Sequence, residues 1–310
     1  MLIQVIIFLI GIALLYSCGV LFVRGSSDTA RIFNIRPLIV GVVIIAFATS
    51  APEFCVSLLA SIKNSRSLAI GNIVGSCICN IGMALGLSAL IRPIKVNLSI
   101  LRREIPILLV ATAALFLACL DLRISRLEAG LFLTGFFIFI YYCIRSAKRE
   151  PSDSLPLPDK ALSRIKPFAY LVIGLAGLLS GAYIAVNSAV ILARHFGISE
   201  LVIGLTVLAI GTSLPELVAS IAASRQGEGE ISIGNVIGSN LFNILGIIGV
   251  ICLIRPIIID KSVITLSLPL LIFYTLALAP IIKSGARIGR LEGGALLLSY
   301  LAYLFLLFKI

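Results

Sequence analysis

The sequence predicts an all-α membrane protein with ten transmembrane helices arranged as two inverted five-helix repeats. The first observation is composition: 60% of the 310 residues are hydrophobic and 13% are charged, with a mean hydropathy of +1.15. A soluble domain of this size cannot bury so much apolar surface, so lipid must be the solvent for most of it. The second observation is a series of ten apolar runs, and the third is an internal repeat.

Each of the ten runs is long enough to cross a bilayer. They lie near residues 2–23, 37–62, 68–91, 104–120, 127–145, 167–193, 199–224, 231–254, 262–282 and 290–308. The first run has no basic residue before it and no small-residue cleavage site after it. We therefore expect a retained first helix and not a signal peptide.

One long polar segment divides the chain. Residues 146–166 contain three prolines and several charges, which is typical of a linker. The prediction is a first five-helix repeat over 1–145, a cytoplasmic linker over 146–166 and a second repeat over 167–310.

The two halves share sequence at a constant offset of 163 residues. Without a gap, 41–94 aligns on 204–257 with 22 of 54 positions identical. Such a match indicates a duplicated structural unit. Because each copy holds five helices, an odd number, the second copy must enter the membrane in the opposite direction. Inverted repeats of this kind place a substrate near the midplane, where the copies meet.

The distribution of basic residues predicts the orientation. Loops after odd-numbered helices hold 17 Lys and Arg, and loops after even-numbered helices hold 7. Basic loops stay in the cytoplasm, so the linker is predicted to be cytoplasmic and both termini extracellular. The same rule accounts for the net charge of +11, and no basic stripe with interleaved aromatics indicates nucleic-acid binding. We expect a multi-pass protein of the plasma membrane.

Two related stretches introduce carboxylates into apolar helices: 48–53, Ala-Thr-Ser-Ala-Pro-Glu, and 211–216, Gly-Thr-Ser-Leu-Pro-Glu. An ionisable residue at membrane depth is costly and marks a pathway or binding site. In each stretch spacings of three and four residues align polar and small side chains on one helix face. These stripes comprise Ala46, Thr49, Ser50 and Glu53 in one copy and Ala209, Thr212, Ser213 and Glu216 in the other. Pro52 and Pro215 should bend the helices and free backbone carbonyls beside the stripes.

The next helix of each half carries a second stripe, in which polar residues recur every four positions. These residues are Asn72, Ser76 and Asn80 in the first half and Asn235, Ser239 and Asn243 in the second. The pairs Gly71/Gly75 and Gly234/Gly238 should let neighbouring helices approach closely. Four helices can therefore bring two carboxylates, amides, hydroxyls and carbonyls to one place.

The ligand set consists of oxygen, which favours hard cations such as Ca²⁺ and Na⁺ over zinc or copper. Cys77 and Cys79 are too closely spaced for a usual zinc motif, and the single histidine, His195, is expected at a membrane interface. The seven cysteines are expected to be free and buried. No cofactor and no obligate protein partner is expected. Two carboxylates balance one Ca²⁺, and three Na⁺ at the same place would leave one positive charge and make exchange voltage-sensitive.

Taken alone, each of these features could also have a purely structural role instead of a role in ion binding. Ser and Thr in membrane helices often bond their own backbone, and proline can simply kink a helix. Asparagine stripes can join helices. The remaining acidic residues at helix ends are expected to be interfacial; these are Glu104, Asp121, Glu128, Asp260 and Glu292.

The duplicated motifs resemble the two α-repeats of the sodium/calcium exchanger family within the cation/calcium antiporters. The similarity covers essentially the whole chain and implies that Glu53, Glu216 and the carbonyls of Thr49 and Thr212 form a Ca²⁺ site. It also implies Na⁺ sites built from hydroxyl or backbone oxygens, with two asparagines beside the central position. The implied Na⁺ ligands are Ser50, Ser76, Ala46, Ser213, Ser239 and Ala209, and the flanking asparagines are Asn80 and Asn243. In this family the first and sixth helices slide across a fixed core.

Departures from the family pattern refine this expectation. Asn243 stands where several prokaryotic and potassium-dependent relatives carry Asp, which disfavours potassium co-transport and proton coupling at that position. Ala48 and Ala51 also replace a Gly and a Leu that the second repeat keeps.

The predicted function is electrogenic exchange of Ca²⁺ for Na⁺, with a 3:1 ratio of Na⁺ to Ca²⁺. Proton/calcium exchange is the alternative. A passive channel and a membrane enzyme fit less well, since a midplane site in inverted repeats favours a transporter and no nucleophile–base pair is evident.

Overall fold

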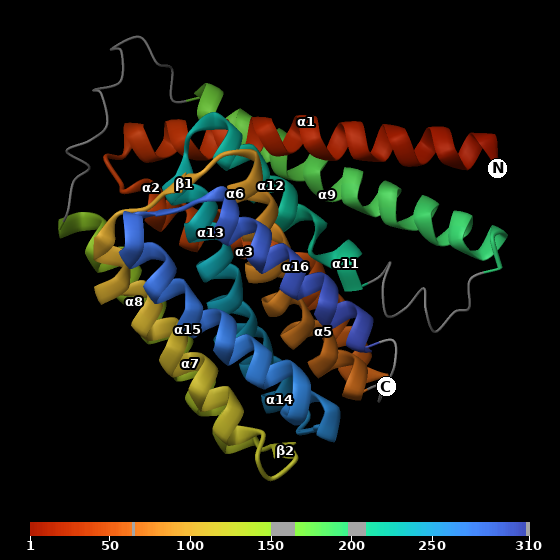
Figure 1. The fold of residues 1–310 in the computed structure, drawn as a ribbon, viewed down its shortest axis with the longest axis vertical. Helices are drawn as coiled ribbons and strands as arrows, with labels where there is room; N and C mark the ends of the chain where they lie inside the picture. The colour runs from red at the N-terminus through yellow and green to blue at the C-terminus, as the bar shows by residue number, and fades with distance from the viewer. Residues whose placement is uncertain (64–65, 150–164, 198–208, 308–310) are drawn as a thin grey trace.

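The computed structural model describes residues 1–63, 66–149, 165–197 and 209–307, and these form a mostly helical membrane protein (Figure 1). Within these described residues, seven helices are long and apolar enough to cross a membrane, or eight if one bent pair is counted as a span. The predicted all-α class is therefore confirmed. Most of the linker, and the first part of the seventh predicted span, lie outside the described residues.

The elements of the first half follow the predicted runs. They are α1 (Leu2–Ile32), α2 (Pro37–Ile39), η1 (Val40–Ile45), α3 (Ala46–Thr49), α4 (Ala51–Ile62), α5 (Arg66–Cys79), η2 (Asn80–Leu85), α6 (Gly86–Ile91), β1 (Ile94–Lys95), η3 (Leu98–Arg102), α7 (Glu104–Ala118), β2 (Arg123–Ile124) and α8 (Arg126–Arg149). Here η1 and η2 are π-helical turns, and η3 is a 3₁₀-helix.

The described part of the second half repeats this order. Its elements are α9 (Ile165–His195), α11 (Ala209–Thr212), α12 (Leu214–Gln226), α13 (Gly229–Leu241), η5 (Phe242–Ile247), α14 (Ile248–Ile254), β3 (Ile257–Ile258), η6 (Val263–Ser267), α15 (Leu268–Gly285), β4 (Arg287–Ile288) and α16 (Arg290–Leu307). The π-helical turn η5 begins at Phe242, one residue before Asn243, and η2 begins at the equivalent Asn80. Both stripe helices thus change their winding within one residue of the equivalent asparagine, and π-helical turns of this kind are frequent at functional sites.

Several helices are longer than the apolar runs that predicted them. The first run ends at residue 23, but α1 continues to Ile32, because polar contacts stabilise its last turns. Ser27 Oγ donates to Glu228 Oε1 at 2.6 Å, and Arg31 Nη2 lies 3.0 Å from the same oxygen. Similarly, α8 and α9 extend a few residues into the predicted linker. Hydropathy marks the part of a helix that lies in lipid, and not the whole helix.

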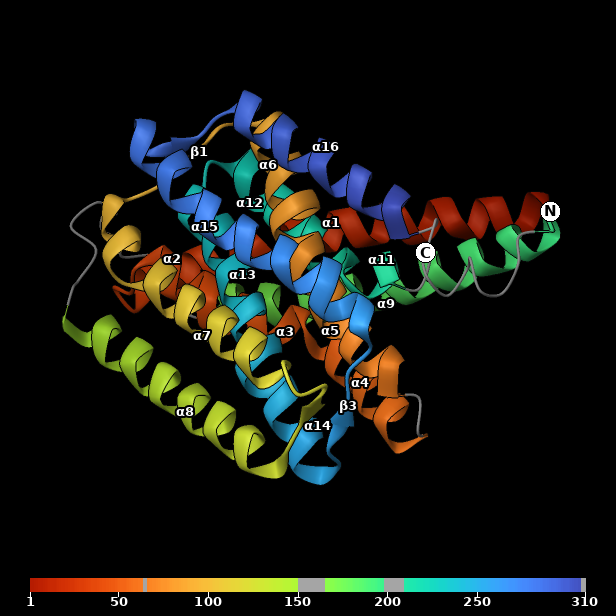
Figure 2. The ribbon, with the colours of Figure 1, turned by 60° about the horizontal axis from the view of Figure 1, so that its bottom comes forward.

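The two longest helices, α1 and α9, form an antiparallel pair that extends beyond the other helices (Figures 1 and 2). Glycines allow their backbones to touch. A β-carbon added at Gly174 would lie 2.5 Å from the Phe22 nitrogen, and one at Gly181 would lie 2.5 Å from the Leu15 nitrogen. Close backbone approach through small residues is a common way to hold helices together in lipid.

We expect Gly174→Ala to lower the melting temperature of the purified protein by several degrees. The added methyl group must push the backbone of Phe22 away, and such overpacking costs about 1–3 kcal/mol. Gly135→Ala is the matched control, because its β-carbon would lie 3.7 Å from the Leu245 side chain, an ordinary contact. Equal melting temperatures for the two variants would show that the α1–α9 contact is not tight.

Two short strand pairs join the halves at the ends of the helices. β1 pairs antiparallel with β4, and β2 pairs antiparallel with β3. In the second pair Ile124 lies opposite Ile257, and both side chains are fully buried. Each pair joins a loop of the first half to a loop of the second half. β1 follows α6 and β3 follows α14, so the pairs connect the ends of the helices that continue the polar stripes.

The glycine pair of the second stripe helix packs as predicted. A β-carbon added at Gly234 would lie 2.6 Å from the Leu38 oxygen, and one added at Gly238 would collide with the Val42 oxygen. The backbone of α13 therefore rests directly on α2 and η1. At the repeat offset, the residues equivalent to α2 and η1 are 200–208, and they lie outside the described residues.

Two predictions about burial need correction. All seven cysteines are free, but Cys55 is exposed and Cys18 is half-buried, so only five are buried in the protein. Glu104 begins α7, as expected for an interfacial residue, but its side chain is only 4% exposed. The fold covers it, because α13 and α15, which lie far from α7 in the sequence, pack against this helix. His195 is exposed near the end of α9, and its position at a membrane interface stays a prediction.

Candidate cation site

Both proline-containing helices break at the predicted position. α3 ends at Thr49 and α4 begins at Ala51, so that Ser50 stands at a bend of 44°. In the second half Ser213 separates α11 from α12. The two serines have nearly the same backbone angles, φ −81° and ψ 7° against φ −89° and ψ 5°. Proline occupies the second position of each new helix, where its missing N–H is not needed.

The breaks let the serine of one half reach the carboxylate of the other. Ser50 Oγ donates to Glu216 Oε1 at 2.8 Å, and Ser213 Oγ lies 3.0 Å from Glu53 Oε1. Ser213 Oγ also lies 3.0 Å from Ser76 Oγ. All these side chains are buried, and both glutamates are 0% exposed. The structure therefore brings both carboxylates and three of the predicted serines together.

Several polar atoms around this cluster are buried without a hydrogen-bond partner. They are Oε2 of Glu53 and of Glu216, Oδ1 of Asn80, Oγ of Ser239, and both Oδ1 and Nδ2 of Asn243. Buried polar atoms are almost always paired, so a group of unpaired oxygens needs an explanation. A cation bound among them would satisfy these oxygens, and hard cations prefer such ligands.

The threonines and alanines of the stripes lie on the same helices, beside the two breaks. Thr49 Oγ1 donates to the Ile45 carbonyl at 3.0 Å, so its hydroxyl serves its own helix, as the structural interpretation anticipates. Ala46 is fully buried, and its carbonyl accepts the Ser50 N–H at 3.0 Å. Ala209 begins α11, which places its backbone next to the second break.

Asn72 and Asn235 support the breaks instead of facing a cation. Asn235 Nδ2 donates to the Glu216 carbonyl at 3.1 Å and to Ser220 Oγ at 2.9 Å. Asn72 Nδ2 donates to Ser57 Oγ at 2.9 Å. Their oxygens lie 3.3 Å from hydroxyls of the opposite half, Asn235 Oδ1 from Thr49 Oγ1 and Asn72 Oδ1 from Thr212 Oγ1. The stripe spacing predicted that these two asparagines lie near the site. It did not predict that they would join helices by hydrogen bonds, a role that we call bracing.

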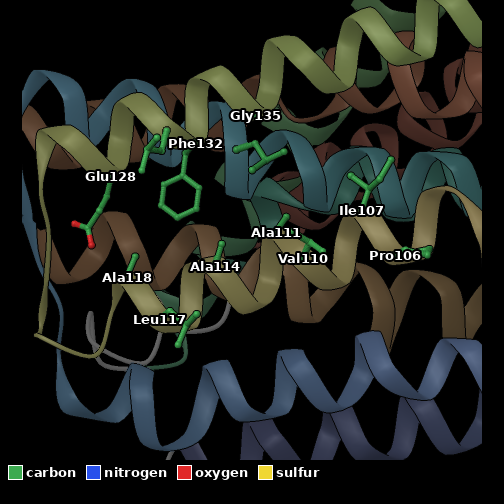
Figure 3. Close-up of a pocket in the computed structure, with 12 residues that line it drawn as sticks. Pro106, Ile107, Val110, Ala111, Ala114, Leu117, Ala118, Glu128, Phe132 and Gly135 are labelled. Atoms are coloured by element: carbon green, nitrogen blue, oxygen red, sulfur yellow. The ribbon is translucent and has the colours of Figure 1, made fainter.

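The chain also has a cavity of about 710 Å³ between α7 and α8, and none of the predicted site residues lines it (Figure 3). Its walls are mostly apolar, with one carboxylate, Glu128, whose Oε2 accepts hydrogen bonds from the Ser125 N–H and hydroxyl. Within the described residues, no group of three or more His, Cys, Asp or Glu side chains could hold a metal ion. A cation site in this part of the chain must therefore rest on hydroxyl, amide and backbone oxygens besides the two glutamates.

Comparison with known proteins shows where this architecture recurs. The sodium/calcium exchanger protein family matches residues 3–145 and 166–309. A putative antiporter, CaxA, of Alkalimonas amylolytica is 40% identical over the full length of both chains, and the sodium/calcium exchanger MaX1 of Methanosarcina acetivorans is 31% identical over 98% of each.

Solved structures of the sodium-calcium exchanger NCX_Mj share the fold. In the form soaked without Na⁺ and Ca²⁺, the TM-score is 0.86, with 34% identity over 99% of each chain. A family match over nearly the whole sequence, together with full-length relatives and a shared fold, leads to one conclusion. This chain belongs to the sodium/calcium exchanger protein family.

Proposed function

We propose that this protein exchanges Ca²⁺ for Na⁺ across the membrane, at one site formed by Glu53 and Glu216 with the surrounding oxygens. The observation that carries the proposal is the pair of crossed contacts between halves, Ser50 with Glu216 and Ser213 with Glu53, each of which leaves one carboxylate oxygen unpaired. Two unpaired carboxylate oxygens among unpaired amide and hydroxyl oxygens suit a hard cation. The names of the relatives support the same pair of ions.

The proposed ligands are those predicted from the sequence. Ca²⁺ would take the two glutamates and the carbonyls of Thr49 and Thr212, while Na⁺ ions would use hydroxyls of Ser50, Ser76, Ser213 and Ser239 and backbone oxygens of Ala46 and Ala209. Asn80 and Asn243 would flank the centre. Since the site carries two negative charges, one Ca²⁺ neutralises it and three Na⁺ leave one positive charge. Exchange in a 3:1 ratio is therefore proposed to be electrogenic, with no cofactor.

The architecture that we propose is ten membrane-spanning helices in two inverted repeats, with the linker in the cytoplasm and both termini outside. The duplicated sequence and the matching breaks at Ser50 and Ser213 support it. A site that takes equivalent groups from both repeats can be exposed to either side by moving one group of helices against another, which is alternating access.

The test is ion flux in vesicles that contain the purified protein. We expect vesicles loaded with Na⁺ to accumulate radioactive Ca²⁺ when diluted into Na⁺-free buffer, and to release it when external Na⁺ is restored. K⁺-loaded vesicles and vesicles with only a pH gradient serve as controls. Uptake that follows the pH gradient would show proton/calcium exchange instead, and uptake that needs no counter-ion would show a channel.

A further inference from the structure

The internal repeat is broken at one position beside the proposed site. At the offset of 163 residues Asn80 matches Asn243, but three residues earlier Cys77 stands where the second half has Asn240. Asn240 is 0% exposed and Asn80 is 1% exposed, so neither amide can use water from the surface. Each half therefore has one asparagine beside the site, but only the second half has the additional amide.

Asn240 connects the backbone of the first half to Asn80. Its Nδ2 donates to the Cys77 carbonyl at 3.1 Å, and its Oδ1 accepts from Asn80 Nδ2 at 3.1 Å. A backbone carbonyl can only accept a hydrogen bond, so it fixes the direction of the Asn240 amide. The Asn240 oxygen then faces Asn80, and this in turn requires Asn80 to present its NH₂ group to Asn240.

This arrangement determines where the oxygen of the Asn80 amide, Oδ1, can lie. Its Oδ1 is buried and has no hydrogen-bond partner. Asn80 begins η2, which packs against α12, the helix that carries Glu216. An unpaired amide oxygen held in one orientation is a ready ligand for a cation, whereas an NH₂ group in its place would repel one.

Asn243 has a weaker neighbour. Its two side-chain polar atoms have no hydrogen-bond partner of ordinary geometry, and the group beside them is the thiol of Cys77, the residue equivalent to Asn240, which also lies 3.9 Å from the Asn240 carbonyl. A thiol is a weak hydrogen-bond group and offers no strong acceptor to fix an amide. Asn80 and Asn243 are equivalent by sequence, but hydrogen bonds fix the orientation of the Asn80 amide more strongly than that of the Asn243 amide.

We propose that Asn240 is a positioning residue that holds the Asn80 amide with its oxygen toward the cation, while Asn243 stays free to turn. The inference rests on the proposed function for the nature of the cation. It makes the site chemically asymmetric: the first half contributes a preset oxygen, and the second half contributes an amide that can present either end. Pre-organised ligands favour binding because they lose less freedom when the ion arrives.

The first test removes Asn240 in two backgrounds and measures binding of radioactive Ca²⁺ to the purified, monodisperse protein. In the wild-type background we expect Asn240→Leu to weaken Ca²⁺ binding about tenfold, because the Asn80 amide can then flip. In the Asn80→Asp background both ends of residue 80 are oxygen, so orientation no longer matters and Asn240→Leu should change binding less than twofold. An equal loss in both backgrounds would show a packing role and overturn the proposal.

A second test needs no Asn240 variant and no ion. Asn80→Asp places a carboxylate oxygen against the Asn240 oxygen, whereas Asn243→Asp, its equivalent in the second half, faces the Cys77 thiol, which can donate a weak hydrogen bond to a carboxylate. We therefore expect Asn80→Asp to lower the melting temperature more than Asn243→Asp does in ion-free buffer. Equal shifts would overturn the inference. If the wild-type protein bound no Ca²⁺, the proposed function would fail, but this stability comparison would still report on Asn240.

Discussion

Replacing either buried glutamate by glutamine, as Glu53→Gln or Glu216→Gln, is expected to reduce Na⁺-dependent Ca²⁺ uptake at least about 100-fold. Each carboxylate is fully buried, so the charge that it provides to Ca²⁺ is not screened by water. With one carboxylate left, a bound Ca²⁺ would keep one uncompensated positive charge in a buried site, and burying an unpaired charge costs several kcal/mol. A loss of about 2.7 kcal/mol in binding already corresponds to a factor of 100.

Glutamine suits this experiment because it keeps the shape of the side chain. Its Oε1 can still accept the hydrogen bond from Ser213 or Ser50, so the contacts between halves can persist while the charge is lost. Glu292→Gln, near the start of α16, is the matched control and should retain uptake. Melting temperatures would establish that all three variants fold. More than half of the wild-type uptake in both site variants would exclude the glutamates from the transport mechanism.

The sequence predicted which residues share the helix faces of the candidate site better than it predicted which of them contact each other. Spacings of three and four residues place Ser50 and Glu53 on one helix face, and the repeat gives the same for Ser213 and Glu216. Helix periodicity says which residues share a face, but not which helix that face meets. The contact of Ser50 with Glu216 depends on how the two halves pack, so the sequence alone could not distinguish it from a contact within one half.

The roles of the asparagines show a second limit. Asn72 and Asn235 share a stripe with Asn80 and Asn243, and residue type alone does not separate a brace from a ligand. The difference is in their partners: Asn235 donates to the Glu216 carbonyl, while the Asn243 amide has only the Cys77 thiol beside it. Duplication does not indicate Asn240, because the equivalent position 77 in the first half is a cysteine. A mismatch between repeats beside a matched polar residue is the signal that could have identified it.

Helix lengths were underestimated for a related reason. Hydropathy detects the part of a helix that lipid surrounds, and the last turns of α1 are instead stabilised by Ser27 and Arg31, which contact Glu228. The burial of Glu104 is also a tertiary effect, since its position at a helix start predicts exposure. These differences all arise where segments far apart in the sequence meet.

Asn243→Asp is expected to move the voltage dependence of transport from the Na⁺-loaded to the Ca²⁺-loaded form. With two carboxylates, the site is neutral with one Ca²⁺ bound and carries one positive charge with three Na⁺ bound. A third, ionised carboxylate makes the Ca²⁺-loaded site negative and the Na⁺-loaded site neutral. The charge moved in a complete 3:1 cycle stays the same. Moving one charge across the membrane changes the free energy by about 2.3 kcal/mol per 100 mV, so the effect on a single step is large.

Exchange of Ca²⁺ for Ca²⁺ isolates the Ca²⁺-loaded step. In vesicles with an imposed membrane potential, wild-type Ca²⁺/Ca²⁺ exchange should be indifferent to voltage, whereas Asn243→Asp should respond to it, most strongly at alkaline pH, where the carboxyl group is ionised. Asn243→Ser removes the amide without adding charge and is the control. Because Asn243 has only the Cys77 thiol beside its amide, neither substitution breaks a strong hydrogen bond. Voltage-sensitive Ca²⁺/Ca²⁺ exchange in the wild-type protein would refute a site charge of minus two, since only a site with another charge moves net charge together with one Ca²⁺.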